Sequence, residues 1–211
     1  AMDKEISKQI FKKNKILTPN FFKLNNNSKL GDLKNKIKKN LGFPVVMKPI
    51  NEGSSVDVYI SNEKNFRKNL SKLRSYREIL IEEYIGGREI QAAILGNRKL
   101  GVIELKPKRK FYDYKAKYNK NAKTKHLIPV KIEKKNLDKV LNISLKAHRA
   151  IGCRGVTRSD FKFYKNKFYL LEINTQPGMT SLSLVPEIAK YKNISFIKLI
   201  EWIIKDASVQ R

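Results

Sequence analysis

The segment Tyr169-Leu-Leu-Glu172-Ile-Asn174-Thr-Gln-Pro177-Gly178-Met-Thr180 does more than any other to decide the fold of this chain. Its apolar first half is typical of a buried strand, which places an acid and an amide two residues apart just before a Pro-Gly turn. Because side chains alternate along a strand, every second residue is predicted to share one face: Phe168, Leu170, Glu172 and Asn174. Two oxygen ligands on one face at the end of a strand suit a hard cation such as Mg²⁺.

A second strand is predicted just before this one, over residues 156–163, with Arg158 and Asp160 on a common face. The sequence Lys-Asn-Lys at residues 165–167 suits a three-residue hairpin loop between the two strands. In that register the acids Asp160 and Glu172 lie directly opposite each other. The two strands are therefore predicted to form one antiparallel hairpin with facing carboxylates.

Facing carboxylates destabilise a sheet unless something neutralises them. A divalent cation held by Asp160, Glu172 and Asn174 would do so. Arg158, predicted to lie opposite Asn174, could then hold a phosphate or a developing oxyanion. The alternative is a solvated hairpin with its charges on the wet face. The turn sequence Asn-Thr-Gln-Pro-Gly-Met-Thr that follows the strand favours a binding site.

Outside this hairpin the chain is predicted to alternate between helices and strands. Helices are predicted over residues 3–14, 30–41, 63–76, 133–151 and 195–205. Strands are predicted over residues 18–24, 43–49, 56–61, 79–85, 89–95 and 100–106. A long polar stretch, residues 107–127, is predicted to be a loop, and loops of that length are usually functional or disordered. The pattern as a whole indicates an α+β protein.

Several segments resemble the D-alanine–D-alanine ligases, a family of the ATP-grasp superfamily. The segments at residues 152–160 and 171–186 are similar to the metal-binding end of that family, and those at residues 42–56, 82–89 and 111–118 agree in the family's order. The resemblance implies an ATP-grasp fold, in which two α+β lobes hold a nucleotide between them. Residues 1–86 would form the central lobe and residues 87–211 the C-terminal lobe, with Gly86-Gly87 as the hinge.

The resemblance also implies a nucleotide site. Lys48 would hold the α- and β-phosphates, a loop after it would close over them, the strand ending at Ile85 would hold adenine, and Glu89 would bind the ribose hydroxyls. The implied nucleotide-binding residues are Lys4, Lys48, Glu52, Gly53, Ser54, Ser55, Glu82, Glu83, Tyr84, Ile85, Glu89 and Lys117. The residues by themselves also allow a simpler interpretation, in which Lys48 extends from a turn to water and the strand is a core edge. Many relatives have Lys in place of Glu83, so no side-chain role transfers to that position.

The implied reaction joins two D-alanines, with ATP, through an acyl phosphate, for peptidoglycan precursors. Mg²⁺ or Mn²⁺ would be the cofactor. The implied catalytic residues are Ser54, Lys117, Tyr118 and Arg158, and the implied substrate-binding residues are Tyr118, Arg158, Gly178, Ser183 and Leu184. Lys117 would reach the γ-phosphate from a loop that folds over the site and excludes water. The alternative for that loop is a solvated segment. A tyrosine at position 118 resembles the dipeptide-forming ligases.

Composition sets wider limits on function. Lys and Arg number 46 against 19 Asp and Glu, a net charge of +27, which allows a nucleic-acid-binding module as an alternative. The lysines are spread along the whole chain and accompany no nucleic-acid motif, so we expect no specific nucleic-acid partner. The apolar runs are too short to span a bilayer. The single cysteine, Cys153, excludes an internal disulfide framework and fits the cytoplasm.

No part of the sequence matches the N-terminal domain of the family. The chain is therefore expected to be a fragment, without part of the first D-alanine site and of the dimer interface through which the full enzyme would form a homodimer. Another carboxylate–amine ligase on the same fold remains an alternative. The amino acid that stimulates phosphate release would distinguish the two.

Overall fold

The computed structural model describes residues 2–25, 30–53, 55–106, 124–180 and 183–207. Its helices are α1 Lys4–Lys13, α2 Leu30–Asn40, α3 Phe66–Lys72, α5 Lys134–Ala150, α6 Leu184–Tyr191 and α7 Phe196–Asp206. Its strands are β1 Phe21–Asn25, β2 Val45–Pro49, β3 Tyr59–Ser61, β4 Glu78–Glu83, β5 Arg88–Leu95, β6 Arg98–Lys106, β7 Lys125–Leu127, β8 Val156–Tyr164 and β9 Lys167–Asn174. The predicted α+β class is confirmed.

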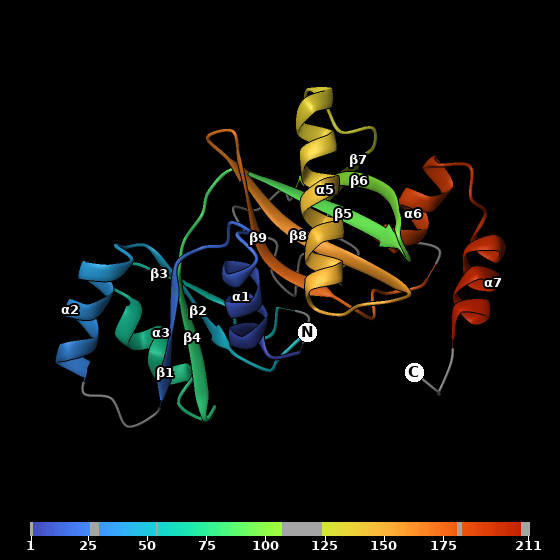
Figure 1. The fold of residues 1–211 in the computed structure, drawn as a ribbon. Coiled ribbons are helices and arrows are strands. Elements are labelled where there is room, and N and C mark those ends of the chain that lie inside the picture. Colours follow the sequence, from blue (N-terminus) through green and yellow to red (C-terminus); the bar gives the residue numbers. More distant parts are fainter. Residues whose placement is uncertain (1, 26–29, 54, 107–123, 181–182, 208–211) are drawn as a thin grey trace.

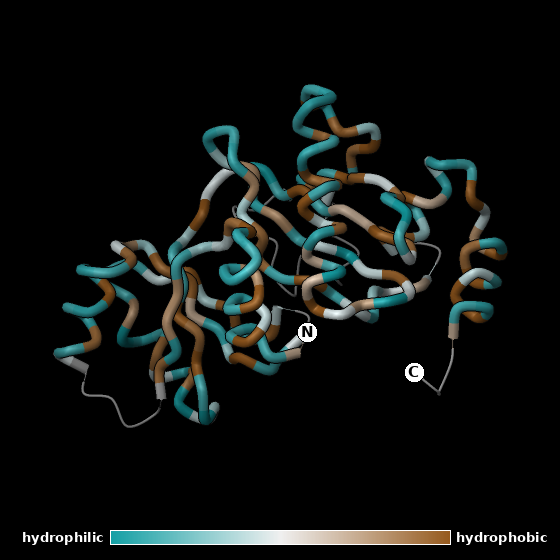
Figure 2. Tube along the Cα trace, viewed as in Figure 1, coloured by the Kyte–Doolittle hydropathy of each residue, from teal (hydrophilic) through white to brown (hydrophobic). Residues whose placement is uncertain are grey.

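The described strands form two antiparallel sheets (Figure 1). The first has the order β1-β4-β2-β3 and packs against α2 and α3. The second has the order β7-β6-β5-β8-β9, with α5 across one face and α6 near the end far from the first sheet. Hydrophobic residues run through the strands of both sheets, whereas the outer turns of α2 and α5 are mostly hydrophilic (Figure 2). The apolar side of each helix packs against its sheet because this contact removes apolar surface from water.

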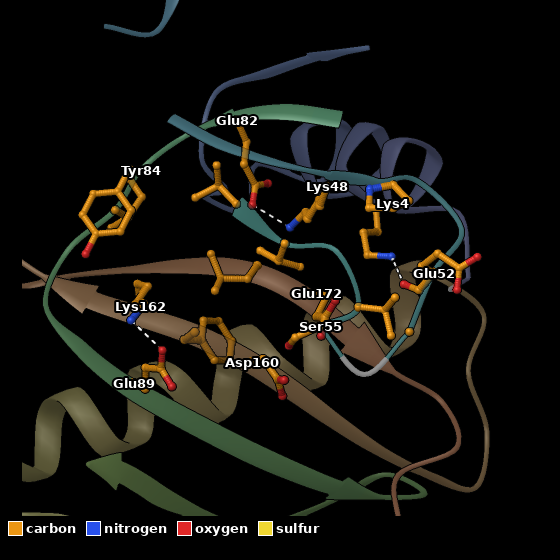
Figure 3. A pocket seen from close by; sticks show the side chains of 18 of the residues that line it. Lys4, Lys48, Glu52, Ser55, Glu82, Tyr84, Glu89, Asp160, Lys162 and Glu172 are labelled. Carbon is orange, nitrogen blue, oxygen red and sulfur yellow. Dashed lines mark hydrogen bonds and ion pairs between the residues drawn. The ribbon is translucent and has the colours of Figure 1, made fainter. Parts of the chain in front are cut away.

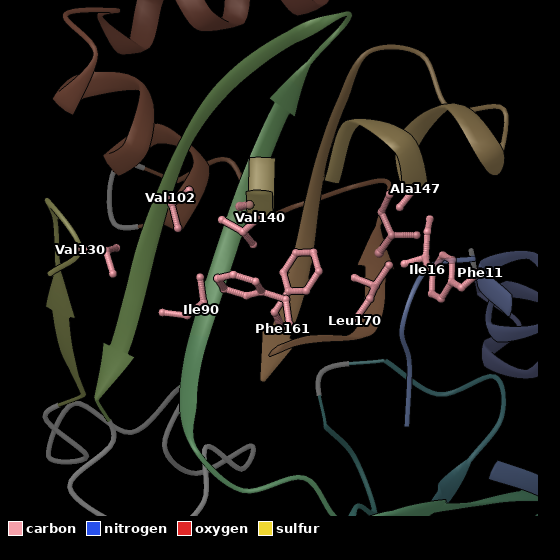
Figure 4. Packing of buried hydrophobic residues seen from close by; sticks show 12 residues of the cluster. Phe11, Ile16, Ile90, Val102, Val130, Val140, Ala147, Phe161 and Leu170 are labelled. Atoms are coloured by element: carbon pink, nitrogen blue, oxygen red, sulfur yellow. The ribbon is translucent and has the colours of Figure 1, made fainter. Parts of the chain in front are cut away.

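Helix α1 joins the core of the second sheet although it precedes the first sheet in sequence. Asp3 caps the helix, because its Oδ1 accepts a hydrogen bond from the Ile6 N–H at 2.8 Å. Phe11 is completely buried and lies beside Ile16 and Ala147 of α5, in the same hydrophobic cluster as Leu170 of β9 (Figure 4). The division of the chain at residue 86 stays a prediction.

Strand boundaries differ from the predictions where the backbone cannot extend. The predicted strand at residues 56–61 begins only at Tyr59, because Ser55 and Asp57 adopt positive φ angles of 60° and 50°. The predicted strand at residues 18–24 begins only at Phe21, after Pro19, which has no N–H for a sheet ladder. The predicted helix at residues 63–76 shortens to Phe66–Lys72.

The long predicted loop also needs correction at its end. Residues 125–127 form β7, which pairs with β6 from Glu104 to Lys106. Residues 107–123, which include the predicted functional residues Lys117 and Tyr118, lie outside the described residues. Ser54 also lies outside them.

The turn of the β8–β9 hairpin has two residues, so the predicted three-residue loop is wrong. Tyr164 pairs with Lys167, and only Lys165 and Asn166 lie between them. Both adopt positive φ angles, 46° and 58°, the conformation of a type I′ turn, whose twist matches that of paired strands. A turn this tight would by itself shift every later cross-strand pair by one residue.

A β-bulge restores the predicted register at the acids. Phe161 pairs with Leu170 but Asp160 pairs with Glu172, so Leu171 is an extra residue on β9. The pairs Asp160–Glu172 and Arg158–Asn174 are therefore confirmed. The predicted common face of Leu170 and Glu172 is wrong, because the bulge separates them: Leu170 is fully buried in the core, whereas Glu172 lines the pocket described below.

Gly87 fits a position between the two sheets that a side chain cannot occupy. Its φ is +88°, and a Cβ atom there would lie 2.3 Å from the carbonyl oxygen of Phe163. Neighbouring Gly86 has no such conflict, since its nearest contact would be a Tyr164 ring carbon at 4.0 Å. We expect Gly87→Ala to lower the free energy of unfolding by about 1–3 kcal/mol, and Gly86→Ala to change it much less. Urea unfolding of both variants measures this; equal effects would contradict it.

Candidate active site

A pocket lies between the two sheets and is lined from both (Figure 3). Twelve of the predicted nucleotide and metal residues line it: Lys4, Lys48, Glu52, Gly53, Ser55, Glu82, Glu83, Tyr84, Ile85, Glu89, Asp160 and Glu172. They come from segments more than 160 residues apart in sequence. The fold therefore brings the predicted phosphate, adenine, ribose and metal residues to one cavity.

The roof of this pocket holds a buried group of three charges that the sequence did not reveal. Glu82 on β4 forms ion pairs with Lys48 on β2 at 2.5 Å and with Lys8 on α1 at 2.9 Å. Lys8 also donates a hydrogen bond to the Thr18 hydroxyl at 2.8 Å. All three charged side chains are at least nine-tenths buried. The Glu82 carboxylate therefore forms ion pairs with two lysines, and these pairs, rather than an adenine base, occupy its side chain.

Burial and pairing act in opposite directions on these groups. Desolvation lowers the pKa of Lys8 to about 8, although Glu82 raises it in part. Desolvation would raise the pKa of Glu82, but the charges of Lys48 and Lys8 outweigh it and bring that pKa to about 2. Glu82 is thus ionised at neutral pH, and the group of three carries a net positive charge next to the pocket.

Lys4 ties the start of α1 to the loop after β2. Its Nζ donates hydrogen bonds to the carbonyl oxygens of Ile50, at 3.0 Å, and Glu52. Desolvation lowers the pKa of Lys4, whereas the nearby charge of Glu172 raises it. Further along this loop, the hydroxyls of Tyr59 and Tyr76 each donate a hydrogen bond of 2.7 Å to Asp57. Hydrogen bonds therefore hold described residues on both sides of Ser54, at Glu52 and at Asp57.

The metal residues lie at the end of the β8–β9 hairpin that faces the pocket. Asp160 pairs directly across from Glu172, and Asn174 follows two residues later. Arg158 donates to both oxygens of Asp160, at 2.8 and 3.0 Å. The arginine on the same strand therefore compensates the charge of Asp160 in the absence of a metal, and the predicted metal site stays a prediction.

The donors at this position suit a hard cation. Asp160, Glu172 and Asn174 offer carboxylate and amide oxygens, the ligands that Mg²⁺ prefers. In the ranges that the structure describes, no group of three or more His, Cys, Asp or Glu side chains is placed to bind a metal. The predicted set has only two acids together with one amide, so it falls outside that kind of group, and it stays a prediction.

The predicted substrate residues lie around the start of α6. Ser183 is the residue that precedes the helix, and its hydroxyl accepts a hydrogen bond from the Thr180 N–H at 3.1 Å. Gly178 lies beside this hydroxyl, since a Cβ there would be 3.0 Å from it. The Leu184 side chain packs into the core formed with α7, so only its backbone N–H can serve a ligand. These three residues and Asn174 do not line the pocket.

Two further polar residues line the pocket and were not predicted: Gln91 on β5 and Lys162 on β8. Lys162 forms an ion pair of 2.7 Å with the predicted ribose residue, Glu89. Because side chains alternate along a strand, Lys162 shares a face with Asp160, two residues before it. Its ion pair with Glu89, 73 positions away in sequence, is seen only in the structure.

The comparisons with known proteins agree with this geometry. The family described as D-ala D-ala ligase C-terminus matches residues 10–205. The D-alanine–D-alanine ligase of Pelagibacter ubique is 68% identical over all of this chain and 69% of its own length. Two structures of the Bacillus anthracis enzyme, the second in complex with ATP, superpose over 97% of this chain and 66% and 65% of theirs, with TM-scores of 0.85 and 0.81 at 34% and 29% identity.

Two facing antiparallel sheets with a charged pocket between them define a protein of the ATP-grasp class. Within that class, the chain belongs to the D-alanine–D-alanine ligase family. It spans about two thirds of the length of the relatives that it matches. In the part of the chain that the structure describes, none of the helices has the length and apolar character to cross a bilayer.

Proposed function

We propose that this chain carries the ATP site of a D-alanine–D-alanine ligase. The observation that carries the proposal is the shared pocket, where Lys48 from one sheet faces Asp160 and Glu172 from the other. The Bacillus anthracis relative binds ATP in its crystal structure, and that protein matches almost all of this chain. The proposed reaction is the ATP-dependent joining of two D-alanines in the cytoplasm by the whole enzyme.

The proposed nucleotide contacts follow from the positions of the residues. Lys48 binds the α- and β-phosphates, since its ammonium lies at the end of a buried strand on the pocket wall. The backbone from Glu83 to Ile85 reads the adenine, and Glu89 accepts hydrogen bonds from the ribose. Lys4 holds the loop after β2 in place by its two backbone contacts.

The proposed chemistry needs no protein nucleophile. Asp160, Glu172 and Asn174 would hold Mg²⁺ or Mn²⁺, which would offset the negative charge of the phosphates. The carboxylate of the first D-alanine attacks the γ-phosphorus and gives an acyl phosphate and ADP. The amine of the second D-alanine then attacks the acyl carbon, and phosphate leaves. Arg158 stabilises the oxyanion of that step, and Ser183 and the Leu184 N–H orient the second carboxylate.

Residues outside the described ranges complete the proposal. By resemblance to the family, Ser54 acts with the phosphate loop, Lys117 binds the γ-phosphate and Tyr118 contacts substrate. The whole enzyme is proposed to be a homodimer without a specific nucleic-acid partner.

The first test reads nucleotide binding, because the chain spans only part of its relatives. We expect the chain to bind ATP with Mg²⁺ in isothermal titration calorimetry. Lys48→Met should weaken this binding by about ten- to a hundredfold, the size of a lost charge-assisted contact. The variant should still fold, since Lys8 remains to pair with Glu82. Lys39→Met removes an exposed lysine from α2 and should leave the affinity unchanged.

Two results would contradict this proposal. A folded chain that binds no ATP would exclude a nucleotide site. Equal losses of affinity in Lys48→Met and Lys39→Met would mean that ATP responds only to the general positive charge of the protein.

A further inference from the structure

Four polar side chains form the floor of the pocket in two cross-strand pairs. Glu89 on β5 lies opposite Lys162 on β8, and Gln91 lies opposite Asp160. All four line the cavity. Figure 3 shows Lys162 reaching toward Glu89, on the opposite side of the pocket from Glu82 and Lys48. The two ends of the floor are thus chemically distinct, with the metal residues at one end and the Glu89–Lys162 pair at the other.

The pair is nearly buried. The Lys162 and Glu89 side chains are 11% and 13% exposed, and Lys162 Nζ lies 2.7 Å from Glu89 Oε1. An ammonium withdrawn from water is costly unless an anion meets it. A lysine that served only to shape the pocket floor would be replaced at less cost by an apolar side chain of similar length. Packing alone therefore does not explain why position 162 carries a charged side chain.

The geometry leaves half of the carboxylate for a ligand. Lys162 engages Oε1, and within the described residues no other hydrogen bond to the Glu89 side chain occurs. Glu89 Oε2 can therefore accept from a hydroxyl group in the pocket. A free glutamate side chain must lose rotamer entropy to make such a bond. Lys162 removes that cost in advance by fixing the carboxylate before the ligand arrives.

We infer that Lys162 is a positioning residue that sets the sugar specificity of the nucleotide site. It holds Glu89 in the orientation that accepts from the ribose hydroxyls, and it thereby favours ribonucleotides over nucleotides that lack those hydroxyls. The inference rests on the proposed function, because it takes the nucleotide to lie with its sugar at Glu89. It assigns to Lys162 a role in recognition that its place in an alternating strand does not suggest.

The test compares two nucleotides that differ only at the sugar. Calorimetry with Mg²⁺ gives the Kd of ATP and of 2′,3′-dideoxyATP for the chain and its variants. We expect the unmodified chain to prefer ATP. Lys162→Met keeps an unbranched side chain of similar length. It should weaken the binding of ATP about tenfold and leave the affinity for dideoxyATP nearly unchanged, so that the preference for ATP is lost. Lys162→Arg should retain most of the preference, and Lys162→Gln is a second neutral variant should the methionine variant not fold.

A matched control separates specificity from general charge. Lys167→Met removes an equal charge from the same hairpin, at an exposed position outside the pocket, and should leave both affinities unchanged. A purely structural role for Lys162 would lower both affinities together, along with the midpoint of thermal unfolding. If the neutral variants keep the preference for ATP, or if their affinities for ATP and dideoxyATP fall by the same factor, the role of Lys162 in specificity is wrong but the proposed nucleotide site stands. If the folded chain binds neither nucleotide, the proposed function itself fails.

Discussion

Glu172→Gln is expected to remove nearly all ligase activity from the whole enzyme while the fold persists. The change takes one charge from the proposed cation site and leaves the shape of the side chain intact. A bound divalent cation contributes several kcal/mol of transition-state stabilisation in reactions of this type. We therefore expect kcat to fall by about a hundredfold or more. Release of phosphate, measured with D-alanine, ATP and Mg²⁺, gives the result.

Asp160→Asn should lower kcat to a similar degree and should also lower the stability of the metal-free chain. Arg158 donates two hydrogen bonds to Asp160, so the amide variant loses a charge-assisted pair even without metal. We expect urea unfolding of the metal-free chain to show a loss of about 1–2 kcal/mol for Asp160→Asn. This contact therefore opposes any gain in stability that Asp160→Asn would bring by relieving the repulsion between the facing acids.

Glu201→Gln supplies the control for both variants. Glu201 is an exposed acid on α7, outside the pocket, so its neutralisation should leave kcat unchanged. Normal kcat in either pocket variant would exclude the proposed metal site. So would equal losses in the pocket variants and in the control, because the effect would then follow total charge.

The largest effect on stability is expected for Glu82→Gln. This acid is the one anion between two buried cations, Lys8 and Lys48, within the described structure. Its removal leaves two ammonium groups next to each other without a counter-charge. Breaking a buried ion pair in this way costs about 3–5 kcal/mol. Lys8→Met should lower the free energy of unfolding much less. It leaves Lys48 and Glu82 as a pair without net charge, and it places an apolar side chain in a buried position.

Urea unfolding of both variants at pH 7 measures this difference. Equal destabilisation by Glu82→Gln and Lys8→Met would mean that packing, and not charge balance, decides the stability of the group. A loss of less than about 1 kcal/mol in Glu82→Gln would mean that the two lysines are solvated rather than buried.

The same group predicts how stability depends on pH. The pKa of Glu82 is about 2 in the folded chain, below its ordinary value of 4.5, so its contribution is present above pH 4.5 and is lost as the pH falls toward 2. That contribution is roughly 3 kcal/mol in full. The pKa of Lys8 is lowered from 10.5 to about 8, so the cost of its charge is relieved as the pH rises between those values. Lys8→Met should abolish the alkaline part and reduce the acid part, because Lys8 also helps to lower the pKa of Glu82.

The candidate site was largely predictable because its residues occur in local patterns. Glu172 and Asn174 lie two residues apart before a Pro-Gly turn, and Lys48 lies at the end of an apolar strand. Each of these positions can therefore be predicted from the local sequence, without knowing which residues lie near it in the fold. The register of Asp160 and Glu172 was correct although the predicted turn was one residue too long. A bulge at Leu171 compensated the difference, and neither feature has a clear signal in a single sequence.

What the sequence by itself determined is the order of elements, the pairing of the polar residues at the end of the β8–β9 hairpin and the family. Local periodicity and turn residues carry that information. Only the tertiary structure decided which charges meet. Lys8 and Lys48 converge on Glu82, and Lys162 on Glu89, across 34 to 74 positions of sequence. Such pairs depend on how two sheets and a helix pack together, and the cost of burying a charge appears only when the packing is known.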